Sequence, residues 1–458
     1  MSHPFNDRRA QIRQEPGASR RSAAGRRRGH TLMRRSACVW LAWAFTTSAA
    51  AQTPGPPAIS GTGQATRSST RRPPAQPPQT MLLAVSLFGG SSDEVTDGGT
   101  SGFATAGPHA DADAMLTYQR RAGLATFGLN GRSVVRRAQS TLTPMRQQGG
   151  FDVAVLGQRQ QFRASQSVSY SPYYQFGGLT DIAPTPLAEA AQSHGDFANA
   201  DLAAVASTTD MDWSWTISRR VALSASYNLR RTTFGRSELD MTSQNVGARL
   251  TRRIARYVSL RTGYTYRVAG SAFAASRAPR DHDLDVGVDY SRPVSISKRT
   301  TLSFGSGSSL TPQDQGMTFH LTGDAALTRL IGRTWNARIG LNRNVHLLEG
   351  FAQPVLANAI NATVGGALQR RVSFSSSASL STGTVGLNAG SGNGYLNWST
   401  GAGLSVSVGR RGAFDAQYFF AGDRFDSGVA LPPGLPNRQR RRQGIRVGFT
   451  WRAPLLGS

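Results

Sequence analysis

The chain has almost no cysteine, a residue on which many secreted proteins depend for disulfides and many metalloproteins for ligands. It has one cysteine among 458 residues, Cys38, and this residue lies in a segment that we expect to be removed on export. The mature chain would then have no disulfide and no thiol chemistry, so its stability must come from backbone pairing. We find no metal-ligand spacing and no glycine-rich stretch that opens a helix, and we therefore expect neither metal nor cofactor.

Long hydrophobic runs are also missing. Hydrophobic residues make up 39% of the chain, glycine occurs 50 times, and no apolar stretch is long enough for a membrane helix. A hydropathy scan would therefore classify the protein as soluble. Transmembrane barrels escape such scans, because their lipid-facing and lumen-facing residues alternate and average out.

Acidic residues are few in proportion to basic ones. The chain has 26 Asp and Glu against 52 Lys and Arg, and Lys298 is the only lysine. A clustered excess of this kind would suggest nucleic acid, but here the arginines are spread along the chain and no basic helix or zinc-finger spacing occurs. We therefore expect no nucleic acid partner. Removal of residues 1–51 takes away ten Arg and two acids and leaves a net charge of +18.

The amino-terminal region divides into three segments. Residues 33–51 have the form of a secretory signal, with Arg34 and Arg35, a short apolar centre, and three alanines before Gln52. Residues 1–32 are Arg-rich and patternless, and are either a disordered leader or a mis-annotated start that precedes translation from Met33. Residues 52–79 are rich in Pro, Ser and Thr, which predicts a flexible periplasmic segment.

The rest of the chain is organised around a hairpin in residues 208–232. Apolar side chains, among them Trp213 and Trp215, fall on every second position, and after Arg219 and Arg220 the alternation resumes. A period of two over about ten residues predicts a strand with one apolar and one polar face. Each strand is long enough to cross a bilayer at a tilt, and its polar face carries charges, so we expect lipid on one side and water on the other.

The same unit recurs from residue 80 to residue 452. The predicted strand pairs are 112–120 with 123–131, 150–157 with 162–174, 208–218 with 221–232, 243–251 with 257–268, 282–291 with 299–310, 316–328 with 333–347, 358–369 with 372–384, and 394–409 with 413–424. Single strands at 80–88 and 443–452 complete a count of about 18, with 16 as the alternative. The fold class is therefore all-β: a transmembrane antiparallel up-and-down β-barrel, followed by a tail at 453–458.

The connections between these strands differ at the two ends. Short turns carry arginine, as at Arg370-Arg371 and Arg410-Arg411, whereas the intervening loops are longer, as at 176–206, 270–281 and 427–443. Outer-membrane barrels have this asymmetry, with their short turns in the periplasm. A set of soluble sandwiches, the competing interpretation, would have similar turns on both sides and a mostly uncharged polar face.

With its signal segment, alternating strands and unequal turns, the chain resembles bacterial outer-membrane β-barrel proteins. The Arg-Arg turns followed by alternating Ser and aliphatic residues are most similar to uncharacterised barrels of exopolysaccharide or exosortase systems. The resemblance implies an outer-membrane location, with lipid and the barrel-assembly machinery as partners. A homo-oligomer and polysaccharide-export proteins are further candidate partners. Such barrels commonly end on an aromatic residue, whereas here Trp451 is followed by seven more residues.

The parity of the strands predicts which side chains face the lumen. The expected pore-lining residues are Arg230, Arg249, Arg261, Arg267, Arg338, Arg446, Asp210, Asp212, Asp283, Asp285, Asp289 and Asp324. The opposite parity predicts an outward set that includes Leu260, Tyr264, Val286, Val288, Phe414, Val447 and Trp451. Ionisable groups at membrane depth require a wet or paired environment. The charges could therefore select ions in an open channel, or form structural ladders of ion pairs, and both can hold at once.

These features favour a passive water-filled pore for small polar or anionic solutes. A component of exopolysaccharide export or assembly is the alternative. A barrel hydrolase is a lesser one, since Asp281-His282-Asp283 with His320 and His346 could supply a general base near the outer rim. No motif provides a nucleophile, and we therefore expect no enzyme and no catalytic residue.

Overall fold

The computed structural model describes most of the chain from residue 79 onward. The described residues are 79–96, 99–100, 107–138, 141–173, 202–235, 239–271, 280–293, 299–313, 316–347, 351, 353–387, 392–431 and 437–456. They all belong to the second of two compact units, Ser48–Ser458. The expected leader, signal segment and periplasmic segment at 1–79 lie outside them, except for Gln79, which begins the first strand. In the described part of the chain, no helix is long and apolar enough to cross a membrane.

The described chain is built from nineteen strands. They are β1 (Gln79–Thr96), β2 (Gly99–Thr100), β3 (Gly107–Ala122), β4 (Ala125–Ala138), β5 (Thr141–Leu156), β6 (Gln160–Ser171), β7 (Ala204–Ser218), β8 (Val221–Phe234), β9 (Met241–Ala255), β10 (Val258–Ser271), β11 (Arg280–Pro293), β12 (Thr300–Gln313), β13 (Gly316–Ile331), β14 (Trp335–His346), β15 (Val355–Ala367), β16 (Val372–Val385), β17 (Gly394–Val408), β18 (Gly412–Phe425) and β19 (Gln439–Leu456). Since β2 has two residues, eighteen long strands form the wall.

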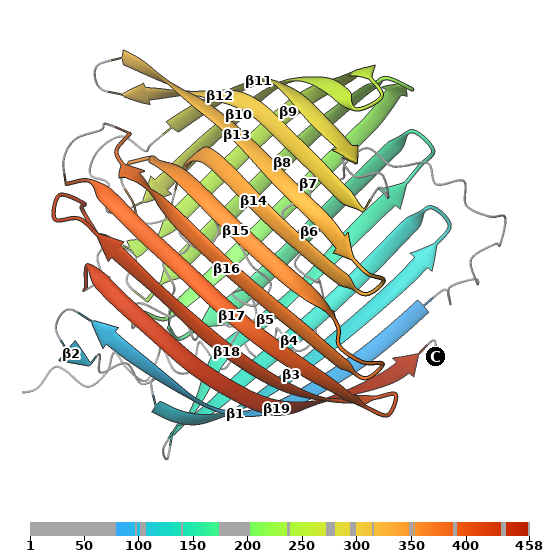
Figure 1. Ribbon diagram of the computed structural model, residues 1–458, viewed down its shortest axis with the longest axis vertical. Coiled ribbons are helices and arrows are strands. Elements are labelled where there is room, and N and C mark those ends of the chain that lie inside the picture. Colours follow the sequence, from blue (N-terminus) through green and yellow to red (C-terminus); the bar gives the residue numbers. More distant parts are fainter. Residues whose placement is uncertain are drawn as a thin grey trace, which may run out of the picture. The chain divides into compact units, whose positions relative to one another are not determined.

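These strands close into one antiparallel barrel. Consecutive long strands pair from β3 to β19, and β1 pairs with both β3 and β19, so that no long strand is left as an edge (Figure 1). Closure matters because every backbone group in a lipid-facing wall needs a partner within the protein. The expected fold class and the count of 18 are confirmed, and the alternative of 16 is wrong.

Both ends of the wall lie at the short-turn end of the barrel. Gln79 at the start of β1 pairs with Arg120 beside the β3–β4 turn, and Trp451 near the end of β19 pairs with Gly412 beside the β17–β18 turn. β19 continues to Leu456, which pairs with Met81. Residues 453–456, expected as part of a tail, therefore belong to the last strand.

The connections at the opposite end are less uniform than expected. β4 runs to Ala138 and β5 begins at Thr141, so two residues join them where the predicted strands 123–131 and 150–157 left a long loop. β12 and β13 are likewise joined by only two residues. In these extensions arginines such as Arg132 and Arg136 interrupt the apolar–polar alternation. Strands are predicted from that alternation, so the predicted strands ended too early.

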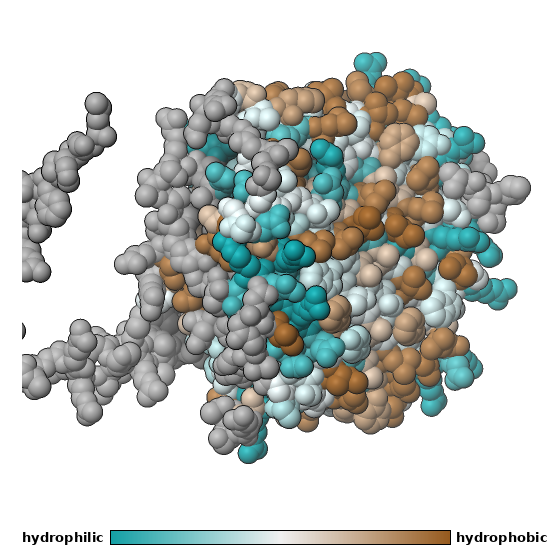
Figure 2. Space-filling view, turned by 60° about the vertical axis from the view of Figure 1, so that its left-hand side comes forward, coloured by the Kyte–Doolittle hydropathy of each residue, from teal (hydrophilic) through white to brown (hydrophobic). Residues whose placement is uncertain are grey.

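The two faces of the wall have the expected character. Exposed large hydrophobic side chains share one parity and face outward; they include Leu260, Tyr264, Val286, Val288, Leu341, Phe414, Val447 and Trp451. Figure 2 shows hydrophobic side chains spread over the wall between the two ends, with hydrophilic ones along the right-hand rim. The alternate positions, which face inward, are occupied by Ser, Thr, Asp and Arg. The wall therefore presents an apolar outer surface and a polar inner one.

One part of the inner wall is apolar and covered. Phe351, from the β14–β15 connection, and Val429, from the β18–β19 connection, pack on inward-facing side chains of β15 to β18. The ring of Phe351 lies 5.9 Å from that of Phe425. Both connections belong to the long-loop end, so their residues narrow the lumen there.

Candidate functional site

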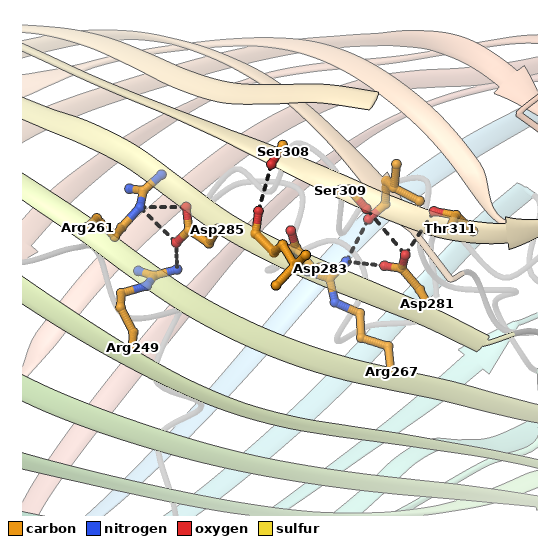
Figure 3. A network of polar contacts seen from close by, with 11 residues as sticks. Arg249, Arg261, Arg267, Asp281, Asp283, Asp285, Ser308, Ser309 and Thr311 are labelled. Carbon is orange, nitrogen blue, oxygen red and sulfur yellow. Dashed lines mark hydrogen bonds and ion pairs between the residues drawn. The ribbon is translucent and has the colours of Figure 1, made fainter. Parts of the chain in front are cut away.

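A polar site on the inner wall is centred on Arg261 in β10 (Figure 3). Its Nε lies 2.7 Å from one carboxylate oxygen of Asp285, and its Nη1 lies 2.5 Å from Asp289. Both carboxylates belong to β11 and flank Gly287, which stands directly opposite Arg261 in the register. The arginine side chain is 7% exposed, so its charge is neutralised by two carboxylates rather than by water.

The guanidinium also reaches β12, where the pairing with β11 is irregular. The β11–β12 register shifts between His282 and Tyr290. In this stretch Nη2 of Arg261 donates to the carbonyl of Ser306 at 3.1 Å, and Oγ of Ser308 donates to the carbonyl of Leu284 at 2.8 Å. These side-chain bonds supply partners for backbone oxygens in the irregular stretch, so the network is part of the wall itself.

Glycine gives Arg261 the space it occupies. A Cβ at Gly287 would lie 1.5 Å from the carbonyl oxygen of Ser306, and a Cβ at Gly305 would lie 3.0 Å from Nη1 of Arg261. A side chain at Gly287 would require a shift of the backbone, and one at Gly305 would displace the charged side chains of Arg261, Asp289 and Asp324. The glycine content of this region thus serves close packing around a buried cation.

Two further arginines form ion pairs nearby. Arg249 in β9 reaches across Gly263 to Asp285, with a distance of 3.0 Å from Nη2 to Oδ2. Arg267 in β10 lies 2.8 Å from Asp283 and 3.4 Å from Asp281. Three predicted arginines and three predicted aspartates therefore form cross-strand ion pairs in two neighbouring groups, one around Arg261 and one around Arg267.

Asp281 is a member of the group around Arg267 that sequence reasoning did not place on the inner wall. It is fully buried and accepts hydrogen bonds from Ser309 at 3.2 Å and Thr311 at 2.8 Å. Its partner Arg267 also donates to the carbonyl of Val345 in β14, at 2.8 Å. Asp281 shares the parity of Asp283 and Asp285, a signal that could have identified it had the strand been started two residues earlier.

A second charged cluster lies on β1, β3, β4, β18 and β19, and none of its members was predicted from the sequence. Asp111 and Arg136 form a fully buried pair at 2.7 Å. Asp113 and Arg132 pair at 2.6 Å. The other members are Glu94, Asp423, Arg440 and Arg442. Six of them lie outside the predicted strands, which ended at 88 and 131 and began at 112 and 443, whereas the observed strands extend farther toward the long-loop end. Asp113 and Asp423 lie within the predicted strands 112–120 and 413–424 but were not assigned to the pore lining.

The remaining predicted residues lie on the inner wall but outside the Arg261 network. Asp210 accepts a hydrogen bond from Asn228 at 2.6 Å, and Asp212 stands opposite Arg163. Asp324 stands opposite Gly305 in the register. Arg230 pairs in register with Thr208 and Ser243, and Arg338 with Thr328 and Thr363. Arg446 lies over the rings of Phe88 and Phe419, at 5.9 and 5.8 Å from their centroids.

Several of these paired charges keep contact with solvent. The side chains of Arg249 and Asp289 are 41% and 30% exposed, and that of Arg132 is 27% exposed. Arg338 is also exposed. Since these side chains point into the barrel, space accessible to water reaches the inner wall at these positions.

His282 does not form the His–carboxylate arrangement that the lesser, hydrolase alternative requires. His282 has the outward parity, and its Nδ1 lies 2.7 Å from the hydroxyl of Tyr264. Its ring also packs against Tyr266, at 5.1 Å between centroids. Asp281 and Asp283 point to the other face of the same strand. Across the described residues, no three His, Cys, Asp or Glu side chains group closely enough to hold a metal ion.

No protein-family model and no curated protein matches the chain. Among solved structures, OccK2 (OpdF) of Pseudomonas aeruginosa in complex with glucuronate is 10% identical, with a TM-score of 0.46 over 82% of this chain and 98% of that one. OpdL of the same organism is 12% identical, with a TM-score of 0.44 over 82% and 99%. With TM-scores below 0.5 these likenesses establish no kinship, and the barrel assignment rests on the strand pairing. Neither concerns exopolysaccharide export, so the narrower resemblance gains no support.

Proposed function

We propose that the protein is an outer-membrane β-barrel that acts as a passive, water-filled pore for small polar or anionic solutes. Three features support this proposal: a closed wall, an apolar outer surface and a charged inner surface. A barrel with this distribution of side chains is suited to lipid outside and water inside. The short turns would then face the periplasm.

The observation that carries the proposal is the partial exposure of inward-facing charges such as Arg249 and Asp289. Eighteen strands spaced by 4.8 Å and tilted by about 40° enclose roughly 35 Å between opposite backbones. Side chains alone cannot fill that width, and larger barrels therefore keep channels or ligand cavities. Phe351 and Val429 cover only one sector of the wall.

The ion pairs argue for weak rather than strong charge selection. Arg261 is neutralised by Asp285 and Asp289, and Arg136 by Asp111. A permeating ion therefore meets adjacent charges of both signs, and the net field along the pore is small. We expect small polar solutes to pass, with a slight preference for anions.

The test is single-channel conductance of the refolded mature protein, Gln52 to Ser458, in a planar bilayer. Discrete conductance steps are the expected result. A folded, heat-modifiable barrel that carries no current would contradict the pore. In that case export or assembly of a polymer becomes the leading function, and docking of a periplasmic partner becomes the next measurement.

A further inference from the structure

A row of polar side chains interrupts the apolar outer face at β14 to β16. Arg343 in β14 stands directly opposite Asn358 in β15, which stands opposite Thr382 in β16. All three are exposed. They share the parity of Leu341 and the other exposed apolar residues of these strands, and therefore face outward.

Directly below this row the wall carries a groove of about 500 Å³. Its outward-facing apolar lining is formed by Leu321, Leu341, Ile360 and Leu380. The polar row, which also lines it, closes the groove toward the long-loop end. Asp324 and Asn342 also line the groove, but they have the inward parity. On its outward side the groove therefore combines an apolar floor with a cationic and hydrogen-bonding end.

Arg343 is held at this end by the backbone. The β13–β14 pairing stops at Gly323 and Arg343, although β13 continues to Gly316. At the point of divergence, Nε of Arg343 donates to the carbonyl of Leu321 at 3.1 Å. Among the described residues, no carboxylate forms an ion pair with Arg343. Its charge is therefore positioned by the wall and remains available to a ligand.

The distance of Arg343 from the short-turn end, measured along the barrel axis, is close to the height of the apolar band of an outer-membrane barrel. β14 begins at Trp335 beside the short turn, eight residues before Arg343. A strand that rises 3.4 Å per residue at a tilt of about 40° climbs about 20 Å over that length. A long arginine side chain can extend several ångströms farther, and the apolar band of such barrels is about 25 Å tall. The guanidinium therefore reaches the outer boundary of the apolar band.

We propose that this groove binds a phosphorylated lipid with several acyl chains, in the leaflet at the long-loop end. Arg343 would bind the phosphate, because a guanidinium donates paired hydrogen bonds to phosphate oxygens. Asn358 would hydrogen-bond the adjoining polar headgroup, and Oγ1 of Thr382, which donates to the carbonyl of Tyr395 at 3.2 Å, would accept a hydrogen bond from it. The groove extends across β13 to β16, three inter-strand spacings or about 14 Å, which is wider than a single acyl chain. This inference rests on the proposed membrane location but not on pore activity.

The test is native mass spectrometry of the refolded mature protein in detergent, titrated with bisphosphorylated hexa-acyl lipid A. The expected result is that Arg343→Gln lowers the bound fraction about tenfold, while Arg343→Lys stays within threefold. Arg231→Gln in β8 is the matched control, because Arg231 is another outward, exposed arginine, and it should leave binding unchanged. Dephosphorylated lipid A should bind weakly to the unaltered protein and be insensitive to Arg343→Gln.

Equal losses in Arg343→Gln and Arg231→Gln would overturn the proposal, because binding would then follow net charge. Tight binding of phosphatidylglycerol with the same dependence on Arg343 would overturn the assignment to a lipid with several acyl chains. Heat modifiability confirms that each variant is folded. Conductance recorded on the same samples separates failure of this site from failure of the pore, since an outward residue should leave the current unchanged.

Discussion

Replacement of Asp285 by alanine tests the role of the Arg261 network in ion selection. Asp285 is shared between Arg249, at 3.0 Å, and Arg261, at 2.7 Å. Its removal leaves Arg249 without this partner and leaves Arg261 with Asp289 alone. The inner wall thereby gains one net positive charge at a position that solvent reaches.

The size of the effect follows from Coulomb's law. A unit charge about 10 Å from an ion in water contributes about 0.4 kcal/mol, which changes the local concentration of each ion about twofold. The anion-to-cation permeability ratio should therefore rise about fourfold at low salt, and less at higher salt because of screening. Loss of the buried Arg261–Asp285 pair should also destabilise the barrel by about 3 kcal/mol, since one partner carboxylate remains.

The assay is the reversal potential of single channels in a tenfold gradient of dilute KCl. Asp285→Ala should shift the reversal potential toward the anion equilibrium value, and Arg261→Ala should shift it the other way. Arg410→Ala, at an exposed turn, is the control and should have a smaller effect. Shifts in the same direction, or no shift in either lumen variant, would refute the assignment of these residues to the conducting path.

Three other substitutions probe the wall. Gly287→Ala should lower the free energy of unfolding by about 3 kcal/mol or more, because the new Cβ would meet a backbone oxygen. Gly131→Ala is the control and should be tolerated, since nothing lies within 4 Å of its Cβ position; the midpoints of urea unfolding compare the two variants. Asp111→Ala should lower the free energy of unfolding by about 3–5 kcal/mol, since Arg136 is left buried without this carboxylate. An unchanged urea midpoint would contradict the buried pair. Phe351→Ala should raise single-channel conductance by uncovering the inner wall; an unchanged conductance would place Phe351 outside the path.

Most of the fold could be predicted from the alternation of apolar and polar side chains along each strand. The hairpin expected at 208–218 and 221–232 is β7 and β8, Ala204–Ser218 and Val221–Phe234. Within each membrane-spanning strand a side chain must face either lipid or lumen, so one apolar face determines the other. For that reason the inward residues Arg261, Asp285 and Asp289 could be identified from sequence.

Parity could not show which inward side chains meet. The contact between Arg267 and the carbonyl of Val345 joins strands that are not neighbours, and no local pattern encodes it. Burial of Phe351 against Phe425 depends on the path of a connection rather than on a strand. The strand extensions that carry Asp111 and Arg136 have no apolar alternation, so the signal ended before the strand did.

In the part of the chain that the structure describes, exposed arginines recur at the short turns. Arg219, Arg220, Arg370, Arg371, Arg410 and Arg411 lie there and are exposed. On the inner wall, by contrast, arginines and aspartates pair with one another. The turns would lie at the inner leaflet, where basic side chains can reach acidic lipid phosphates. The net charge of the chain is therefore a poor guide to the selectivity of the lumen.

The central claim is that the charged face of the wall lines an open aqueous path, and site-specific labelling tests it most directly. Residues 52–458 contain no cysteine, so in a protein of this length single cysteines can replace Arg338, which is inward and exposed, or Ile339, which is outward and 52% exposed. An anionic methanethiosulfonate reagent added to a conducting channel should lower the current through Arg338→Cys and leave Ile339→Cys unchanged. A current that is insensitive to the reagent in Arg338→Cys, or that falls only in Ile339→Cys, would contradict the account.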